Sequence, residues 1–238
     1  GIHCNYLNSN LQDNITPFLD SLASKSINFK NCYANGTRTA YGLSSIISSY
    51  PVIPGYPLNR YKKYQQKESA NPTFASIIKK INPKYQTIFM YGGDSNFDEM
   101  KPFLQANSFD IFIDRIEDDK ISKLILDNKH EGVNPWGVFD EYLFDRFIEV
   151  IDLNTENKLP TFTTILSTTN HVPWIIPEKF KNDIKQYKSN KKDFEQSKTT
   201  MIYVDTILKN FFNQIKDKEW FKNTIFIITA DHGLTVNR

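Results

Sequence analysis

The chain has 238 residues and a mass of 27.7 kDa, which is enough for one sizeable domain with a hydrophobic core. Hydrophobic residues make up 39% and aromatic residues 14%, so the composition excludes a disordered or low-complexity chain. The 29 Lys and Arg nearly balance the 27 Asp and Glu, and the net charge of +2 argues against nucleic acid as a partner. No apolar run approaches the roughly 18 to 20 residues that cross a bilayer. Without repeats or linkers, we expect a single domain over residues 1–238.

Expected helices and strands alternate along the chain. Thr16 followed by Pro17 is typical of a helix N-cap and first helical position, and predicts a helix through Ser24. A second helix is expected from Thr39 to just before Pro51. The later expected elements are a helix over 73–81, a strand over 86–91, a helix over 136–153, a strand over 161–166, a helix over 193–215 and a strand over 224–229. This alternation predicts an α/β fold in which a mostly parallel central sheet is flanked by helices.

Polar side chains follow each of the three expected strands. Asp94 follows the first strand, His171 follows the second, and Asp231 and His232 follow the third. Because ligands of open α/β sheets bind outside the carboxyl ends of the strands, we expect these side chains to converge. Carboxylate and neutral imidazole suit Zn²⁺ or Mn²⁺. The competing interpretations are a turn at Asp94, a helix cap at Asp231 and a surface turn at His232, and the Asp-His-Gly tripeptide alone favours them.

A second candidate site is the turn that leads into the helix at Thr39. The free N–H groups and the dipole of a helix N-terminus stabilise a phosphate or sulfate, and Arg38 can add a charge-assisted contact. The competing interpretation is that Thr39 only caps the helix. A Thr hydroxyl is a poor nucleophile unless a base or a metal removes its proton, so Thr39 needs Asp231 and His232 nearby.

Other side chains give weaker signals. Trp136 can line a binding pocket, but a Trp that opens an amphipathic helix is more often a packing anchor. We interpret Asp140 as structural. Cys4 and Cys32 allow at most one disulfide, and the sequence does not decide between the bonded and the free state.

The combination of motifs resembles the sulfatase family within the alkaline phosphatase superfamily. The resemblance rests on the segments Thr16-Pro-Phe-Leu-Asp-Ser-Leu-Ala23, Phe29-Lys-Asn-Cys-Tyr-Ala-Asn-Gly-Thr-Arg-Thr39 and Thr229-Ala-Asp-His-Gly233. Three further segments are similar to the lipoteichoic acid synthase and phosphoglycerol transferase subgroup: Tyr91-Gly-Gly-Asp-Ser-Asn-Phe-Asp98, Trp136-Gly-Val-Phe-Asp140 and Thr169-Asn-His-Val-Pro173. The resemblance covers nearly the whole chain and implies an alkaline-phosphatase-like α/β sandwich.

The resemblance implies a role for individual residues. Thr39 matches the nucleophile and a metal ligand, Asp231 and His232 match two further ligands of a divalent metal, Mn or Zn, and His171 matches a substrate-side histidine. It implies a phosphotransferase or phosphodiesterase that passes a phosphoglycerol-type head group through a phospho-threonine, with His171 as acid or charge stabiliser. Arg38, Asp94 and Trp136 are the other expected substrate contacts. Sulfate-ester hydrolysis is disfavoured, because sulfatases mature a Cys or Ser at the nucleophile position.

The resemblance also sets the context of the chain. It implies one metal-binding acid before Gly1 and further strands after Arg238, so we expect a fragment of the catalytic domain. It implies a phospholipid or another phosphate or sulfate ester as substrate, and a parent protein held at a cell membrane by an N-terminal anchor with this domain outside the cytoplasm. Two alternatives stay open: a sulfuric or phosphoric ester hydrolase of the same fold, and an inactive fragment or binding module.

Overall fold

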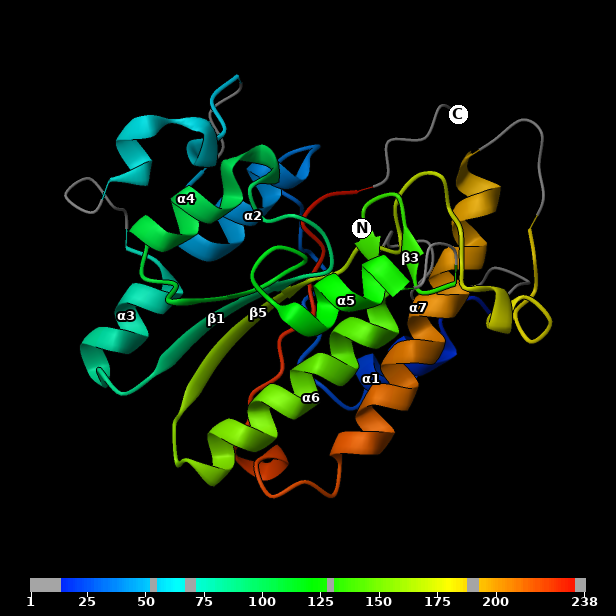
Figure 1. The fold of residues 1–238 in the computed structure, drawn as a ribbon. Coiled ribbons are helices and arrows are strands. Elements are labelled where there is room, and N and C mark those ends of the chain that lie inside the picture. Colours follow the sequence, from blue (N-terminus) through cyan, green and yellow to red (C-terminus); the bar gives the residue numbers. More distant parts are fainter. Residues whose placement is uncertain (1–13, 52–54, 67–71, 128–130, 188–192, 234–238) are drawn as a thin grey trace.

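The computed structural model describes residues 14–51, 55–66, 72–127, 131–187 and 193–233 (Figure 1). Its centre is a three-stranded parallel sheet in the order β2-β1-β5, formed by β2 (Ile111–Ile113), β1 (Gln86–Tyr91) and β5 (Thr161–Leu166). Ile88 in β1 lies opposite Ile111 on one side and Thr163 on the other. The predicted α/β class and the predicted bounds of β1 and β5 are confirmed.

Helices cover the sheet. Their bounds are α1 (Pro17–Ser24), α2 (Thr39–Ser48), α3 (Phe74–Ile81), α4 (Met100–Ala106), α5 (Asp119–Asp127), α6 (Asp140–Glu156) and α7 (Asp193–Ile215). A small antiparallel hairpin joins β3 (Val133–Asn134) to β4 (Gly137–Val138). Single 3₁₀ turns occur at Leu58–Arg60, Lys62–Gln65, Phe97–Glu99, Glu178–Phe180 and Phe221–Asn223. None of the described helices combines the length and the apolar character that a membrane span requires.

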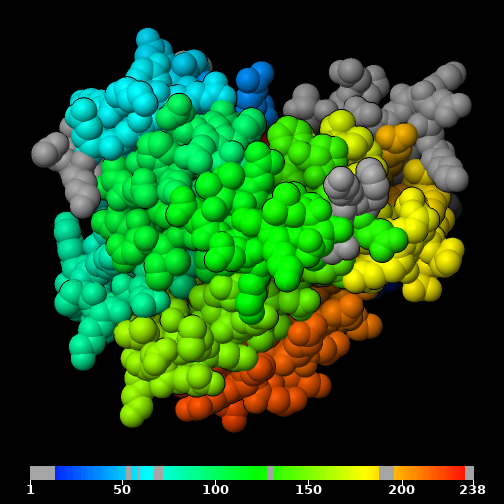
Figure 2. Space-filling model, viewed as in Figure 1, coloured from blue at the N-terminus to red at the C-terminus, as the bar shows by residue number. Residues whose placement is uncertain are grey.

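The side chains of β1 alternate between two apolar cores. Ile88 and Met90 are fully buried among residues of α5, α6 and α7, whereas Phe89 and Tyr91 pack on the opposite face with α2, α3 and α4. Figure 1 shows these two groups of helices on either side of the strands, and in Figure 2 the side chains of the green segments cover the sheet on the viewed face. Burial contributes roughly 1.5 to 3 kcal/mol for each such side chain, so both helical layers hold β1 in place.

The predicted strand over 224–229 is wrong. Residues 224–230 have no regular secondary structure, although Figure 1 shows this red segment running beside β5. Within the described chain, no backbone hydrogen bond links the segment to β5, and the side chains of Ile225 and Ile227 are 90% and 77% exposed. A strand requires a hydrogen-bonded neighbour as well as apolar residues, and this segment has none among the described residues.

The helix expected to start at Trp136 begins instead at Asp140. Asn134 Oδ1 accepts hydrogen bonds from the backbone N–H groups of Trp136, at 2.8 Å, and Gly137, at 3.1 Å, which closes a turn between β3 and β4. Gly137 has φ of +155°, a conformation that favours glycine, and a helix cannot continue through it. Trp136 therefore lies in a hairpin turn.

The N-terminus of α1 is capped from a distant part of the chain. The helix begins at Pro17 as predicted, but the Thr16 side chain makes no cap hydrogen bond. Instead the buried Asp205 carboxylate on α7 accepts the backbone N–H groups of Phe18, at 3.0 Å, and Leu19, at 2.8 Å. These are two of the N–H groups that a helix leaves without an internal partner.

Replacing Asp205 by Ala is expected to lower the free energy of unfolding by about 2 kcal/mol or more, because two N–H groups at a partly buried helix end lose their acceptor. Asp205→Asn keeps an acceptor oxygen and should lose less. Urea unfolding followed by circular dichroism measures both changes. An equal loss in the two variants would contradict the capping role.

Because Gly42 has no side chain, α2 can lie in direct contact with the backbone of Asp231. A methyl group at Gly42 would overlap the backbone carbonyl of Asp231. Because α2 begins at Thr39, the contact holds the N-terminal turn of α2 against the segment that carries Asp231 and His232. The two motifs that the sequence places almost two hundred residues apart are therefore adjacent.

Gly42→Ala is expected to displace the backbone at Asp231 and to destabilise the fold by about 1 to 3 kcal/mol, as overpacking does. In a helix without this contact the same change would stabilise by about 1 kcal/mol, so the sign of the effect is diagnostic. Thermal unfolding and the amide resonances of Asp231 and His232 measure it. Gly233→Ala is the control, because a methyl group there meets nothing within 4 Å.

Candidate active site

Turns at the carboxyl ends of the strands form one rim of the molecule. Because β1, β2 and β5 are parallel, the residues that follow them lie at the same edge of the sheet. Asp94 follows β1 and His171 follows β5, as predicted. Asp114 and Arg115 follow β2, a strand of three residues that the sequence pattern did not predict; the apolar run Ile111–Ile113 before these charged residues is the signal that could have found them.

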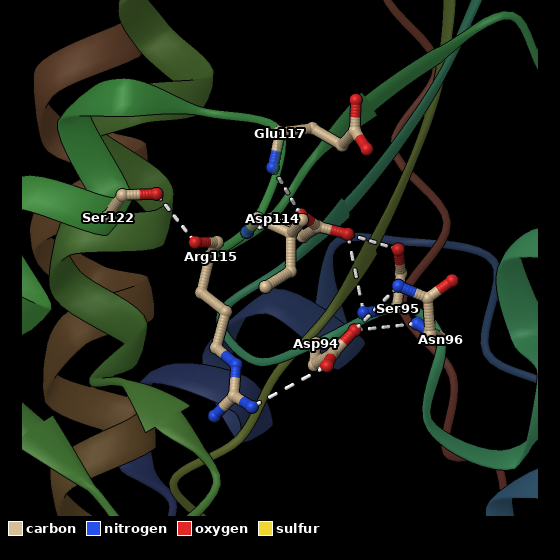
Figure 3. A network of polar contacts seen from close by, with 8 residues as sticks. Asp94, Ser95, Asn96, Asp114, Arg115, Glu117 and Ser122 are labelled. Atoms are coloured by element: carbon tan, nitrogen blue, oxygen red, sulfur yellow. Dashed lines mark hydrogen bonds and ion pairs between the residues drawn. The ribbon is translucent and has the colours of Figure 1, made fainter.

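The Asp94 side chain is part of a polar network at this rim (Figure 3). Its Oδ1 accepts hydrogen bonds from the backbone N–H of Asn96, at 2.9 Å, and from the Asn96 side chain, at 3.0 Å. Its Oδ2 lies 3.5 Å from the Arg115 guanidinium. The carboxylate therefore closes its own turn and pairs with a cation from the neighbouring strand end.

A buried carboxylate holds the same two turns together. Asp114 is fully buried, and its Oδ2 accepts a hydrogen bond from the Ser95 hydroxyl. Its Oδ1 accepts the backbone N–H groups of Ile116 and Glu117, both at 2.8 Å. Figure 3 shows Asp114 between the turn after β1 and the turn after β2. The position of Asp94 is thus fixed by contacts within the protein.

His171, in the turn after β5, lies against Trp136 of the β3–β4 hairpin. Their ring centroids are 4.0 Å apart, and the Trp136 indole N–H donates to the backbone carbonyl of Val172 at 2.7 Å. Partial burial lowers the pKa of the His171 imidazole below its ordinary value. Its Nδ1 is 3.1 Å from the same Val172 carbonyl, which can only accept, so this contact places the proton on Nδ1 and leaves Nε2 of the neutral ring as an acceptor.

One large cavity joins most of the predicted site residues. It has a volume of about 1160 Å³, and its lining includes Thr39, Trp136, His171, Asp231 and His232. Apolar side chains from both cores line much of the rest. The first residue of α2, the β3–β4 hairpin, the turn after β5 and the segment with Asp231 and His232 therefore all border the same cavity.

Arg38 lies apart from this cavity. It is exposed and lines a separate hollow of about 280 Å³ with Tyr41, Arg60 and Tyr61. Its backbone carbonyl accepts the N–H groups of Tyr41 and Gly42, both at 3.0 Å, and so starts α2. Asp94 is also absent from the lining of the large cavity.

The donor groups at the cavity fit a divalent cation in part. Asp231 Oδ2 and His232 Nε2 are 3.5 Å apart and both side chains are mostly buried. Two ligands at about 2.1 Å from a tetrahedral metal lie about 3.4 Å from each other, so this pair matches the spacing that one ion requires. Across the described part of the chain, no three His, Cys, Asp or Glu side chains gather as a metal site. Thr39, which lines the same cavity, is the third candidate donor.

Phe97 was not predicted as part of the site. Its ring meets that of Trp136 edge to face, with centroids 5.9 Å apart, and it also lines the cavity. Phe97, Trp136 and His171 therefore form a row of rings along the rim. Of the cysteines, Cys32 is exposed, and Cys4 lies outside the described residues.

Comparison with known proteins agrees with the resemblance in the sequence. Residues 5–238 match the family described as sulfatase. Phosphoglycerol transferase I of Salmonella typhi is 22% identical over 231 residues, which are 95% of this chain and 29% of that protein. The chain therefore spans less than a third of the length of this relative.

Solved structures share the fold. A protein in the alkaline phosphatase superfamily from Vibrio parahaemolyticus superposes with a TM-score of 0.71 at 29% identity, covering 87% of this chain and 46% of that chain. The lipoteichoic acid synthase LtaP from Listeria monocytogenes superposes with a TM-score of 0.64 at 22% identity, covering 85% of this chain and 46% of that chain. Because the family match covers all but the first four residues, the chain belongs to the sulfatase family, with the α/β fold of the alkaline phosphatase superfamily.

Proposed function

We propose that residues 1–238 are part of the catalytic domain of a metal-dependent phosphotransferase or phosphodiesterase. In this proposal the enzyme transfers a phosphoglycerol-type head group through a phospho-threonine intermediate at Thr39. The observation that carries the proposal is the shared cavity of Thr39, His171, Asp231 and His232. Membership of the sulfatase family supports an enzyme that transfers or hydrolyses esters. The distant relation to phosphoglycerol transferase I favours a phosphate ester as substrate.

Thr39, Asp231 and His232 are the residues that would hold Mn²⁺ or Zn²⁺. A bound divalent cation supplies positive charge that favours loss of the hydroxyl proton and offsets charge on the phosphate. The position of Thr39 as the first residue of α2 adds the free N–H groups and the dipole of a helix N-terminus, which also favour an anion.

The proposed transfer has two steps on this chain. First, Thr39 Oγ1 forms a bond to phosphorus while the bond from phosphorus to the leaving alcohol breaks, and the hydroxyl proton passes through His171 to the leaving oxygen. Second, the hydroxyl of an acceptor alcohol or of water bonds to phosphorus, the bond to Thr39 breaks, and the proton returns to Thr39. A neutral His171 with Nε2 as acceptor suits the proton transfers in both steps.

Arg38, Asp94, Trp136 and His171 are proposed to contact the substrate. Of these, Trp136 and His171 line the cavity of Thr39, whereas Arg38 lines a separate hollow and Asp94 is in the lining of neither. The natural substrate is proposed to be a phospholipid or a related phosphate ester. A site outside the cytoplasm at a cell membrane, with an N-terminal anchor in a longer parent chain, rests on the family resemblance alone.

Covalent labelling of Thr39 tests the proposal. The chain is incubated with Mn²⁺ or Zn²⁺ and bis(p-nitrophenyl) phosphate, and intact mass and peptide mapping locate any phosphoryl adduct. We expect the adduct on Thr39 and its complete loss in Thr39→Val, because Thr39 is the first residue of α2, whose Gly42 meets the Asp231 carbonyl. Thr37→Val, an exposed threonine two residues earlier, is the matched control and should label normally.

The acceptor then distinguishes transfer from hydrolysis. Glycerol added to the labelled chain should remove the phosphoryl group as a glycerol ester, whereas release to water alone would favour the hydrolase. Turnover of p-nitrophenyl sulfate without labelling of Thr39 would overturn the phospho-threonine. A folded chain that is neither labelled nor active on either ester would leave the inactive module as the better interpretation.

Calorimetric titration with Mn²⁺ and Zn²⁺ tests the metal site without any substrate. We expect binding by the folded chain and a loss of at least tenfold in affinity in Asp231→Ala, because the pair of donors becomes a single one. Asp217→Ala, an exposed carboxylate after α7, is the control and should bind as the parent does. Equal binding in all three proteins would place the metal elsewhere.

A further inference from the structure

The hairpin segment 134–140 is wedged between two turns of the rim. A methyl group at Gly137 would overlap the carbonyl of Gly92, and one at Gly93 would overlap the carbonyl of Trp136. The N–H of Val138 donates to the Gly92 carbonyl at 3.0 Å. On this side the segment is therefore packed directly onto the turn that follows β1.

On its other side the segment bonds to the turn that follows β5, through Asp140. Asp140 is 1% exposed, and its Oδ1 accepts the backbone N–H groups of Thr168, at 2.9 Å, and Thr169, at 3.2 Å. The N–H of Asp140 donates to the Thr169 hydroxyl at 3.2 Å, and the Thr168 hydroxyl donates to the Val138 carbonyl at 2.7 Å. Four hydrogen bonds thus fix the two residues that precede Asn170 and His171.

Trp136 fixes the same turn beyond His171. Its indole N–H donates to the Val172 carbonyl at 2.7 Å, and its ring covers the imidazole at a centroid distance of 4.0 Å. The Phe97 ring packs edge to face against the indole, with centroids 5.9 Å apart. The turn is therefore held by Asp140 at the residues that precede His171 and by Trp136 at Val172, which follows it.

The position of Asp140 in α6 does not by itself explain these contacts. Asp140 is the first residue of that helix, where an acidic side chain commonly stabilises the helix dipole. Its bonded oxygen, however, reaches residues 28 and 29 positions away. Burial raises the pKa of Asp140, and its Oδ2 accepts no hydrogen bond from any described residue. A carboxylate buried in this way costs stability, which only its bonds to the turn offset.

We propose that Asp140 and Trp136 are positioning residues that clamp the turn after β5 and so set the place of the His171 imidazole at the cavity. The clamp rests on the proposed function of His171 for its catalytic consequence, but its geometry can be tested without any turnover.

Ring-current shifts of the His171 imidazole protons test the geometry by NMR, since they depend on the distance to the Trp136 ring. In the full chain we expect upfield shifts that Asp140→Ala moves toward the values of a free imidazole. Asp140→Asn keeps the Oδ1 acceptor and should keep most of the shift, so a clamp that depends on hydrogen bonds is separated from a general loss of the fold. Trp136→Phe keeps a ring but loses the N–H, and is expected to broaden the His171 signals.

Asp205→Ala is the matched control for these variants. It also removes a buried carboxylate that accepts two backbone N–H groups, but those groups belong to α1. Asp205→Ala should lower stability and leave the His171 shifts unchanged. Unchanged His171 shifts in folded Asp140→Ala, or equal changes in Asp205→Ala, would overturn the clamp.

A double-mutant cycle tests the catalytic consequence. With bis(p-nitrophenyl) phosphate as substrate, misplacing His171 in Asp140→Ala is expected to lower kcat by about tenfold to a hundredfold. Asp140→Ala combined with His171→Gln should be no slower than His171→Gln alone, because the clamp acts only through His171. If the losses in kcat of the two single variants multiply in the double variant, Asp140 does not act through His171. If the parent chain never labels Thr39, the proposed function fails, while the NMR result still decides the clamp.

Discussion

The parallel pairing of β1 with both of its neighbours is the constraint on which the site depends. Parallel strands end at the same edge of a sheet, so the turns after β1, β2 and β5 must form there together. The two apolar cores fix the rotation of β1, because a shift by one residue would exchange Ile88 and Met90 with Phe89 and Tyr91. Burial on both faces of one strand therefore determines which side chains can meet at the rim.

Much of this fold could be predicted from local patterns. The apolar, β-branched composition of β1 and β5 and the spacing of apolar residues in α7 are sufficient to place these elements, and Pro17 marks the start of α1. The segment 224–229 is apolar and β-branched like β5, but it makes no strand pairing among the described residues, because composition does not specify a pairing partner. β2 is too short to produce a pattern, and the order of the three strands is a property of tertiary packing alone.

The site shows the same division between local and distant information. Residues that follow strands, such as Asp94 and His171, were predictable because their place depends only on where a strand ends. The contacts of Asp140 with Thr168, and of Asp205 with the start of α1, join residues 28 and more than 180 positions apart. No periodicity or cap signal encodes such pairs. Trp136 is a different case, because the helix predicted from this residue gives way to a local turn that the nearby Asn134 side chain closes.

Polar groups at the rim fall into two sets with different consequences for function. Asp94, Asp140 and the Trp136 indole N–H bond to the protein itself, to Asn96, Thr168 and Val172 respectively. Thr39, His171 and the pair Asp231 and His232 form the second set; they line the cavity, which Trp136 and Asp140 also border. Under the proposed function, changes in the first set would move the proposed reacting groups, whereas changes in the second would remove them. Since the bonded groups of the first set already hold the turns, any ligand of the cavity has to be distinguished mainly by the other side chains that line it.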